Sequence, residues 1–286
     1  MNFRTDLAIE AAMEHPADGR HVVQEQYQKQ GVAVSHLQVL TPHGEGLVGK
    51  PRGRYVTVTL PALTDDETVL TRHSEVVGRE LERLLPPQGT VLVVGLGNRT
   101  VTPDALGPAV ADMVLATRHI RGEFARTAGL TDLRPVAVLA PGVLGQTGTE
   151  SGELVRGVCR EIHPAAVIVV DALAARGLGR LGRTVQLCDS GISPGSGVGN
   201  NRRPLNKDLL GVPVIGMGIP TVVDAATLTR DTVGREPHGE AAEMMVTPRE
   251  VDIMIARGAR LLAYAIHGVL QPDYVPAELT EVARGM

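Results

Sequence analysis

Two aspartates, each placed after a short apolar run, are the best candidates for chemistry in this sequence. Asp104 lies in the motif TPDALGP, after the run TVLVV and its glycine turn, and Asp171 ends the run VIVVD. In open α/β sheets the ligand site lies at the carboxyl ends of the strands. Two carboxyl groups at that edge could share a proton, one acting as general base and the other as general acid.

Each aspartate also has a purely structural explanation. Asp104 could lie in the first turn of a helix with Thr102 as its N-cap, because acids are favoured there. Asp171 could cap whatever follows its strand. Residues 165–175 are otherwise almost wholly apolar, so a carboxylate at 171 would lose solvation and its pKa would rise unless a partner held it. We therefore favour a functional role for Asp171, whereas both explanations of Asp104 stay open.

Glycine-rich turns are candidates for substrate binding. The GLGN turn lacks the third glycine and the downstream acid of a dinucleotide fingerprint, so no nicotinamide cofactor is expected. The loop PGSGVGN at 194–200 could present backbone N–H groups to a substrate carbonyl, or could merely form a turn. The expected substrate-binding residues are Gly97, Asn98, Gly195, Gly197 and Gly199.

Other peptidase and metal motifs are incomplete. The Asp189-Ser190-Gly191 triplet imitates pepsin-like enzymes, but those are all-β proteins. Ser196 lacks a nucleophile elbow because position 194 is Pro, and Cys188 has no His placed by spacing. The nine histidines form no HExxH or other ligand pair, so neither a metal nor another cofactor is predicted.

The order of apolar runs and helical segments predicts the fold class. Apolar runs alternate with helices expected at about 104–119, which His119 would end, and at 150–162. This spacing is typical of βαβ units and predicts a twisted, mainly parallel α/β sheet with helices on both faces. The runs lie at 90–94, 135–139, 165–170, 184–188 and 212–217.

The two ends of the chain complete a single predicted domain, 1–286. Residues 5–30 read as a polar, helix-leaning segment, and 31–40 and 55–60 alternate like half-buried strands. These belong to an extension, 1–60, before the α/β core at 90–270. Further helices are expected at 66–85 and from a capping box at 247–250 to about His267.

Composition excludes several partners. The net charge of −4 and the basic clusters at 50–54 and 202–203 are typical of solvated loops, and few aromatics are available for base stacking, so nucleic acid is not an expected partner. No uninterrupted apolar stretch approaches the roughly 18 residues of a membrane span. Without a signal peptide or cysteine framework, we expect a cytoplasmic protein.

Long motifs across the chain resemble the germination protease family of endospore-forming bacteria. They include GLGNRTVTPDALGP, APGVLGQTGTESGELVRGV, VIVVDALAARGLGRLG, DSGISPGSGVGNNRRPL and GVPVIGMGIPTVVDAATLTRDT. The resemblance implies an endopeptidase that degrades small acid-soluble spore proteins during germination. It further implies an atypical aspartic peptidase with Asp104 and Asp171 catalytic, a fold similar to hydrogenase-maturation endopeptidases, a homotetramer, and a location in the forespore or spore core.

The family is also made as a self-processing zymogen, and the segment RTDLAIEA resembles the acid–apolar–Ala–x–Glu pattern that it cleaves. We therefore expect cleavage between Leu7 and Ala8, which would release a propeptide of about 1–7. The alternative is that this segment simply begins a helix. One departure is the short segment 233–245, which is longer in the family.

Two rival functions stay open at this point. The first is a metal-dependent maturation-type endopeptidase, in which the acids would bind a metal of the partner protein. The second is a non-enzymatic binder of spore proteins, in which the aspartates would be structural. Activity in excess chelator separates both from an aspartate-pair enzyme.

Overall fold

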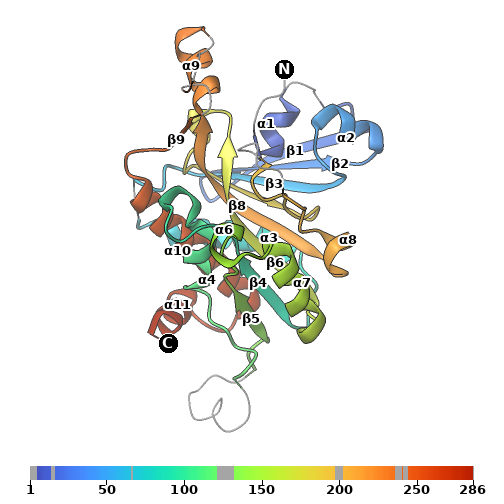
Figure 1. Cartoon of the computed structure of the whole chain (residues 1–286), viewed down its shortest axis with the longest axis vertical. Helices are drawn as coiled ribbons and strands as arrows, with labels where there is room; N and C mark the ends of the chain where they lie inside the picture. Colours follow the sequence, from blue (N-terminus) through green and yellow to red (C-terminus); the bar gives the residue numbers. More distant parts are fainter. Residues whose placement is uncertain are drawn as a thin grey trace.

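A single mixed sheet forms the frame of the protein in this computed structural model (Figure 1). The structure describes residues 5–13, 17–65, 67–120, 132–196, 202–235, 240 and 244–285. Within these residues nine strands lie in the order β1-β2-β3-β7-β8-β6-β4-β5, with β9 paired to β8. Their bounds are β1 Val22–Lys29, β2 Val32–Val39, β3 Gly53–Thr59, β4 Val91–Gly95, β5 Val136–Leu139, β6 Ala166–Ala175, β7 Thr184–Cys188, β8 Val214–Asp224 and β9 Met245–Val246.

The α/β class is confirmed, and the direction of its strands is more mixed than predicted. Strands β5, β4, β6 and β8 are parallel neighbours, whereas β7 and the N-terminal strands β1, β2 and β3 pair antiparallel. The apolar run at 184–188 forms β7 as expected, but it runs antiparallel to β8. An apolar run indicates that a strand is buried on both faces, but it does not indicate the direction of the strand. The sequence alone therefore could not distinguish parallel from antiparallel pairing.

Helices cover both faces of the parallel part of the sheet. Alternate residues of β4 and β6 point to opposite faces. Val93 and Ile168 pack in one core with helices α3, α4 and α10, whereas Leu92 and Val167 pack in a second core with Val155 of α7. The helices are α1 Ala8–Ala12, α2 Pro42–Val48, α3 Leu70–Glu82, α4 Leu106–Ala111, α6 Leu144–Thr147, α7 Ser151–Ile162, α8 Lys207–Leu210, α9 Ala225–Val233, α10 Val251–Leu270 and α11 Pro276–Gly285, with 3₁₀ turns η1 Thr102–Asp104 and η2 Leu178–Arg180.

Helix α10 is the central helix of the larger core. Among the described residues it is the one helix long and apolar enough to cross a membrane. Most of it is instead buried inside the protein, where it packs against α3 and α4. Its apolar composition is therefore accounted for by the core.

The structure corrects several boundaries. Residues 22–29 form strand β1 and not a helical segment, because they pair along their whole length with the more apolar β2. The helix expected at 104–119 is only α4, and His119 does not end it. Beyond α4 the Leu115 N–H donates to His267 Nε2 at 2.9 Å instead of to a helical carbonyl. The capping box expected at 247–250 does not form: α10 begins at Val251 without a side-chain N-cap, and the Thr247 hydroxyl donates to the Thr221 carbonyl at 2.8 Å.

Candidate active site

Asp104 is held at the carboxyl end of β4 by a tight turn. Gly97 has φ +118°, and a Cβ at this position would lie 2.0 Å from the Asp104 carbonyl oxygen. The turn aims the Asn98 N–H at Asp104, whose Oδ2 accepts it at 2.7 Å. From the other side, the Thr221 hydroxyl of β8 donates to the Pro103 carbonyl at 2.7 Å. The turn after β4 therefore holds the Asp104 carboxylate, and β8 holds the main chain of the preceding Pro103.

The structure corrects the helix-cap explanation of Asp104 in part: the residue does lie in the first turn of a short helix, but Thr102 is not the N-cap. The residue lies in η1, whose N-cap is Val101 and not Thr102, and α4 begins after Ala105 without a side-chain cap. The Asp104 carboxyl group accepts its hydrogen bond from the turn that follows β4. It is therefore directed toward the edge of the sheet and not toward the start of a helix.

Asp171 lies inside a strand, not at its end. Strand β6 continues to Ala175, and Asp171 pairs with Gly218 of β8. Only 7% of Asp171 is exposed, and its Oδ1 accepts the N–H of Ala172 at 3.0 Å. Burial raises the pKa of Asp171 well above the usual value of an aspartate. A capping role is excluded, because the strand does not stop at this residue.

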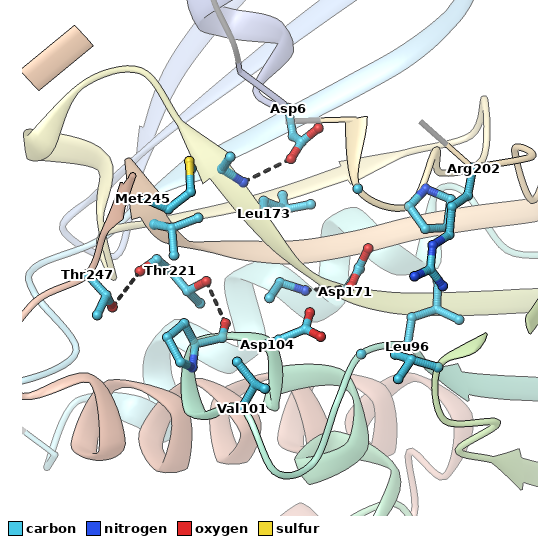
Figure 2. Close-up of a pocket in the computed structure, with 18 of the residues that line it drawn as sticks. Asp6, Leu96, Val101, Asp104, Asp171, Leu173, Arg202, Thr221, Met245 and Thr247 are labelled. Carbon is cyan, nitrogen blue, oxygen red and sulfur yellow. Dashed lines mark hydrogen bonds between the residues drawn. The ribbon is translucent and has the colours of Figure 1, made fainter. Parts of the chain in front are cut away.

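The two aspartates converge on one cavity of about 390 Å³ (Figure 2). Burial also raises the pKa of Asp104, and the Asn98 N–H opposes this by stabilising the ionised form. After burial, the negative charge of Asp104 is the next cause of the raised pKa of Asp171. The two carboxyl groups therefore interact electrostatically, as a pair that shares a proton requires. The cavity wall is largely apolar, with Leu96, Val101, Val143, Leu173, Val222 and Met245.

Two charged residues of the cavity were missed in the sequence. Asp6 lines the cavity, where its Oδ2 accepts the Ala174 N–H at 2.9 Å and its Oδ1 accepts the Ser196 hydroxyl at 2.5 Å. Arg202, taken above as a solvated loop residue, also lines it, and its positive charge lowers the pKa of both Asp104 and Asp171. A basic pair beside a glycine-rich loop was the signal that could have pointed to Arg202.

The predicted substrate-binding glycines are placed only in part. Gly97 and Gly195 line the cavity, whereas Gly197 and Gly199 lie outside the described residues. Asn98 holds Asp104 through its N–H, and its side-chain oxygen accepts hydrogen bonds from Thr100 and Gln146. Its visible role is therefore to position the turn.

The segment that carries the predicted processing bond is docked beside the cavity. Leu7 and Ala8 are both fully buried, and Leu7 packs with Leu173 of β6. Gln186 binds the main chain on both sides of Leu7: its Oε1 accepts the Ala8 N–H at 2.6 Å and its Nε2 donates to the Asp6 carbonyl at 2.9 Å. The bond between Leu7 and Ala8 is therefore shielded in this arrangement.

Metal ligands do not gather at this site in the described part of the chain. No group of three His, Cys, Asp or Glu side chains there is arranged to hold a metal ion. Cys159 and Cys188 are buried free thiols, and burial raises the pKa of each.

The sequence of this chain is similar to those of a known protein family. A family model described as germination protease matches residues 5–235. The germination protease of Clostridium perfringens (strain ATCC 13124) is 37% identical over 98% of this chain and 98% of its own length. That of Priestia megaterium is 41% identical over 81% of this chain and 66% of its own.

The chain belongs to the germination protease family. It is therefore an endopeptidase of spore germination. The alignment with the C. perfringens relative spans 322 residues, more than the 286 of this chain, so that relative carries residues that this chain lacks. A [NiFe] hydrogenase maturation protease, HycI from Thermococcus kodakarensis, is a distant structural neighbour with a TM-score of 0.40 and 21% identity, over 67% of this chain and 99% of its own.

Burial of Asp171 predicts that the Asp171→Asn protein is more stable than the native protein at neutral pH. When folding raises the pKa of a carboxyl group, the folded protein loses stability as the pH rises from the unfolded pKa of that group, near 4, through its folded pKa. Removing it should raise the free energy of unfolding at pH 7 by roughly 1.4 kcal/mol for each tenfold rise in proton affinity. The gain should vanish below about pH 4, where the carboxyl is protonated in both states.

Thermal unfolding of both proteins from pH 3.5 to pH 8 measures this effect. Asp252→Asn, at an exposed position in the first turn of α10, is the matched control and should change little at any pH. Equal stability of native and Asp171→Asn proteins across the whole range would show that Asp171 is not an unpaired buried carboxyl.

Proposed function

We propose that this enzyme degrades small acid-soluble spore proteins during germination, using Asp104 and Asp171 as an aspartate pair. The single observation that supports the pair is that both carboxyl groups face one cavity, with the charge of Asp104 raising the pKa of Asp171. The family supports the peptidase activity itself. The substrate class comes from the resemblance of the motifs given above.

In this proposal the two aspartates have different roles. Asp171, which is nearly inaccessible, is the protonated partner: its O–H first hydrogen-bonds to the scissile carbonyl oxygen and polarises it, and the same proton is then transferred to the leaving amine. Asp104 is more exposed, and the Asn98 N–H stabilises its ionised form, so it is the base that takes a proton from the attacking water. Asp104 gains one proton from the water and Asp171 loses one to the amine, so the pair keeps a single proton, which passes from Asp104 back to Asp171 before the next turnover.

Purified protein incubated with a small acid-soluble spore protein tests this function. We expect cleavage at defined internal bonds, read by mass spectrometry, and the same rate in excess EDTA or phenanthroline, since no metal takes part in the proposed steps. Loss of cleavage on chelation, with recovery on adding one divalent metal, would contradict the aspartate pair. A stable complex without any cleavage would contradict the peptidase activity.

The chain is further proposed to be a zymogen that cuts itself between Leu7 and Ala8. Asp6 lines the cavity that contains Asp104 and Asp171, so the peptide bond predicted to be cut, one residue further along, lies close to the proposed catalytic pair. Because Leu7 and Ala8 are buried, the segment must leave its place before the bond can reach the aspartates. That release, and not the chemistry, would then set the rate of processing.

Mass spectrometry of the N-terminus, sampled alongside activity, tests the processing. We expect activity to rise as residues 1–7 are lost, and a chain produced from Ala8 onward to be active without a lag. Full activity with an intact N-terminus would contradict the proposal.

Assembly and location complete the proposal. The enzyme works as a homotetramer in the cytoplasm of the forespore or spore core, where its substrates are found. It needs no cofactor, and neither nucleic acid nor a membrane is its direct partner. Light scattering coupled to gel filtration measures the subunit number.

A further inference from the structure

Strand β6 extends beyond the end of its neighbour β4, so the last part of the β6 edge that faces β4 has no strand beside it in the described structure. The last pair between them is Gly95 with Val170, whereas β6 stays paired with β8 as far as Ala175. Residues 171–175 therefore have β8 on one side and no described strand on the other. This stretch begins at Asp171, so the open edge starts at the catalytic pair.

Main-chain contacts at both ends of this edge fix which groups face it. The Leu96 N–H donates to the Val170 carbonyl at 2.8 Å, and the Asp6 N–H donates to the Ala174 carbonyl at 2.9 Å. Alternate residues of a strand direct their main-chain groups to the same edge. Ala172, midway between Val170 and Ala174, therefore presents its N–H and C=O to this edge.

Ala172 lies on the wall of the cavity. Its N–H donates to the Oδ1 of the adjacent Asp171 at 3.0 Å. Ala172 and Ala174 both line the cavity, together with Asp104 and Asp171. Figure 2 shows the two carboxyl groups below the stretch of β6 that carries Leu173, with Asp6 on its far side. A chain lying along this edge would pass directly by both carboxyl groups.

We propose that the substrate binds as an added strand on this edge of β6, with its main chain hydrogen-bonded to Ala172. This inference rests on the proposed function and adds how the substrate is held. An unpaired strand edge is a ready template for an extended peptide, and main-chain hydrogen bonds then supply affinity independent of side chains. The docked N-terminal segment already occupies the edge at Ala174, with one main-chain hydrogen bond from the Asp6 N–H and one through the Asp6 carboxylate.

The edge and the cavity together define the class of substrate. The segment must be extended, because a helix has no free main-chain groups to offer a strand. Side chains of a bound strand alternate, so every second one enters the cavity. The cavity wall is largely apolar, and the bound segment should therefore place an apolar side chain beside the scissile bond. Unfolded or loosely folded proteins are the substrates that fit.

An ester scan of the substrate main chain tests this inference. The probe is a synthetic peptide that spans the bond cut in the spore protein, in a series where one peptide N–H at a time is replaced by an ester oxygen, away from the scissile bond. Strand binding predicts that KM rises roughly 2–10-fold, the loss of one hydrogen bond, at the position whose N–H reaches the Ala172 carbonyl. In enzyme that has lost residues 1–7, a second rise is expected two residues away, where an N–H reaches the Ala174 carbonyl, and little change at the other positions. A rise at all positions alike, or at none, would overturn the proposal.

Hydrogen exchange separates this inference from the proposed function. The Asp104→Asn protein is compared with and without the intact spore protein. We expect slower exchange in residues 171–175 and no change at the outer edge of β1, an open edge at the far end of the sheet. Protection of 171–175 without cleavage by the native enzyme would support the edge and contradict the aspartate mechanism. Cleavage by the native enzyme without such protection would support the proposed peptidase function and contradict strand binding at this edge.

Discussion

Replacing Asp104 or Asp171, the proposed catalytic pair, with asparagine is expected to lower kcat by about 10³-fold or more while leaving the fold unchanged. General acid and general base catalysis each contribute about 10²–10⁴-fold, and an amide can serve as neither. Asn is nearly isosteric with Asp, so Asp104→Asn keeps an oxygen for the Asn98 N–H. The measurement is the rate of cleavage of a spore protein, with circular dichroism and thermal unfolding to verify folding.

Asp252→Asn, on the surface of α10, is the control and should retain full activity. If the aspartates act as one unit, as proposed, the double variant should be little slower than the slower single variant. Near-normal cleavage by either single variant would remove that residue from the mechanism. Effects that multiply in the double variant would show that the residues act independently.

The second large effect is expected from Gly97→Ala. The new Cβ would lie 2.0 Å from the Asp104 carbonyl oxygen, and φ +118° is a conformation that alanine strongly disfavours. The turn must shift and carry Asp104 with it. A displacement of about 1 Å at a catalytic group costs on the order of 100-fold in rate, and we expect a loss of this size in kcat/KM.

Gly145→Ala is the matched control for this substitution. A Cβ at position 145, in the short helix α6, meets nothing within 4 Å, and its backbone conformation is not left-handed. Both proteins are assayed for activity and for thermal unfolding. Unchanged kcat/KM in Gly97→Ala would mean that the position of Asp104 does not depend on this turn.

Part of the site could be predicted because it depends on local sequence. The apolar runs that became β4 and β6 mark strands buried on both faces, and the acids that follow or end them must lie near the carboxyl edge of the sheet. The rule brings Asp104 and Asp171 to the same region, but it places Asp171 at the end of its strand, whereas β6 continues to Ala175. The buried surroundings of Asp171 could be predicted in the same way, from the apolar residues on both sides of it.

The rest depends on contacts between distant segments. Strand β1 is polar at most positions, and it is a strand because β2 pairs with it. Asp6 reaches the cavity through hydrogen bonds to Ala174 and Ser196, which follow it by more than 160 residues. The effect of the Arg202 charge on the aspartates likewise depends on tertiary structure: its main-chain N–H donates to the Pro194 carbonyl at 3.3 Å. Neither periodicity nor spacing reports such pairings.

The pH dependence of kcat/KM tests most directly whether Asp104 and Asp171 share a catalytic proton. An aspartate pair predicts a bell-shaped profile with apparent pKa values that belong to the pair, both above the usual range because burial raises both. Arg202→Gln should move both limbs to higher pH, since the guanidinium lowers both pKa values. A profile without an alkaline limb, or limbs that stay in place in Arg202→Gln, would contradict the account.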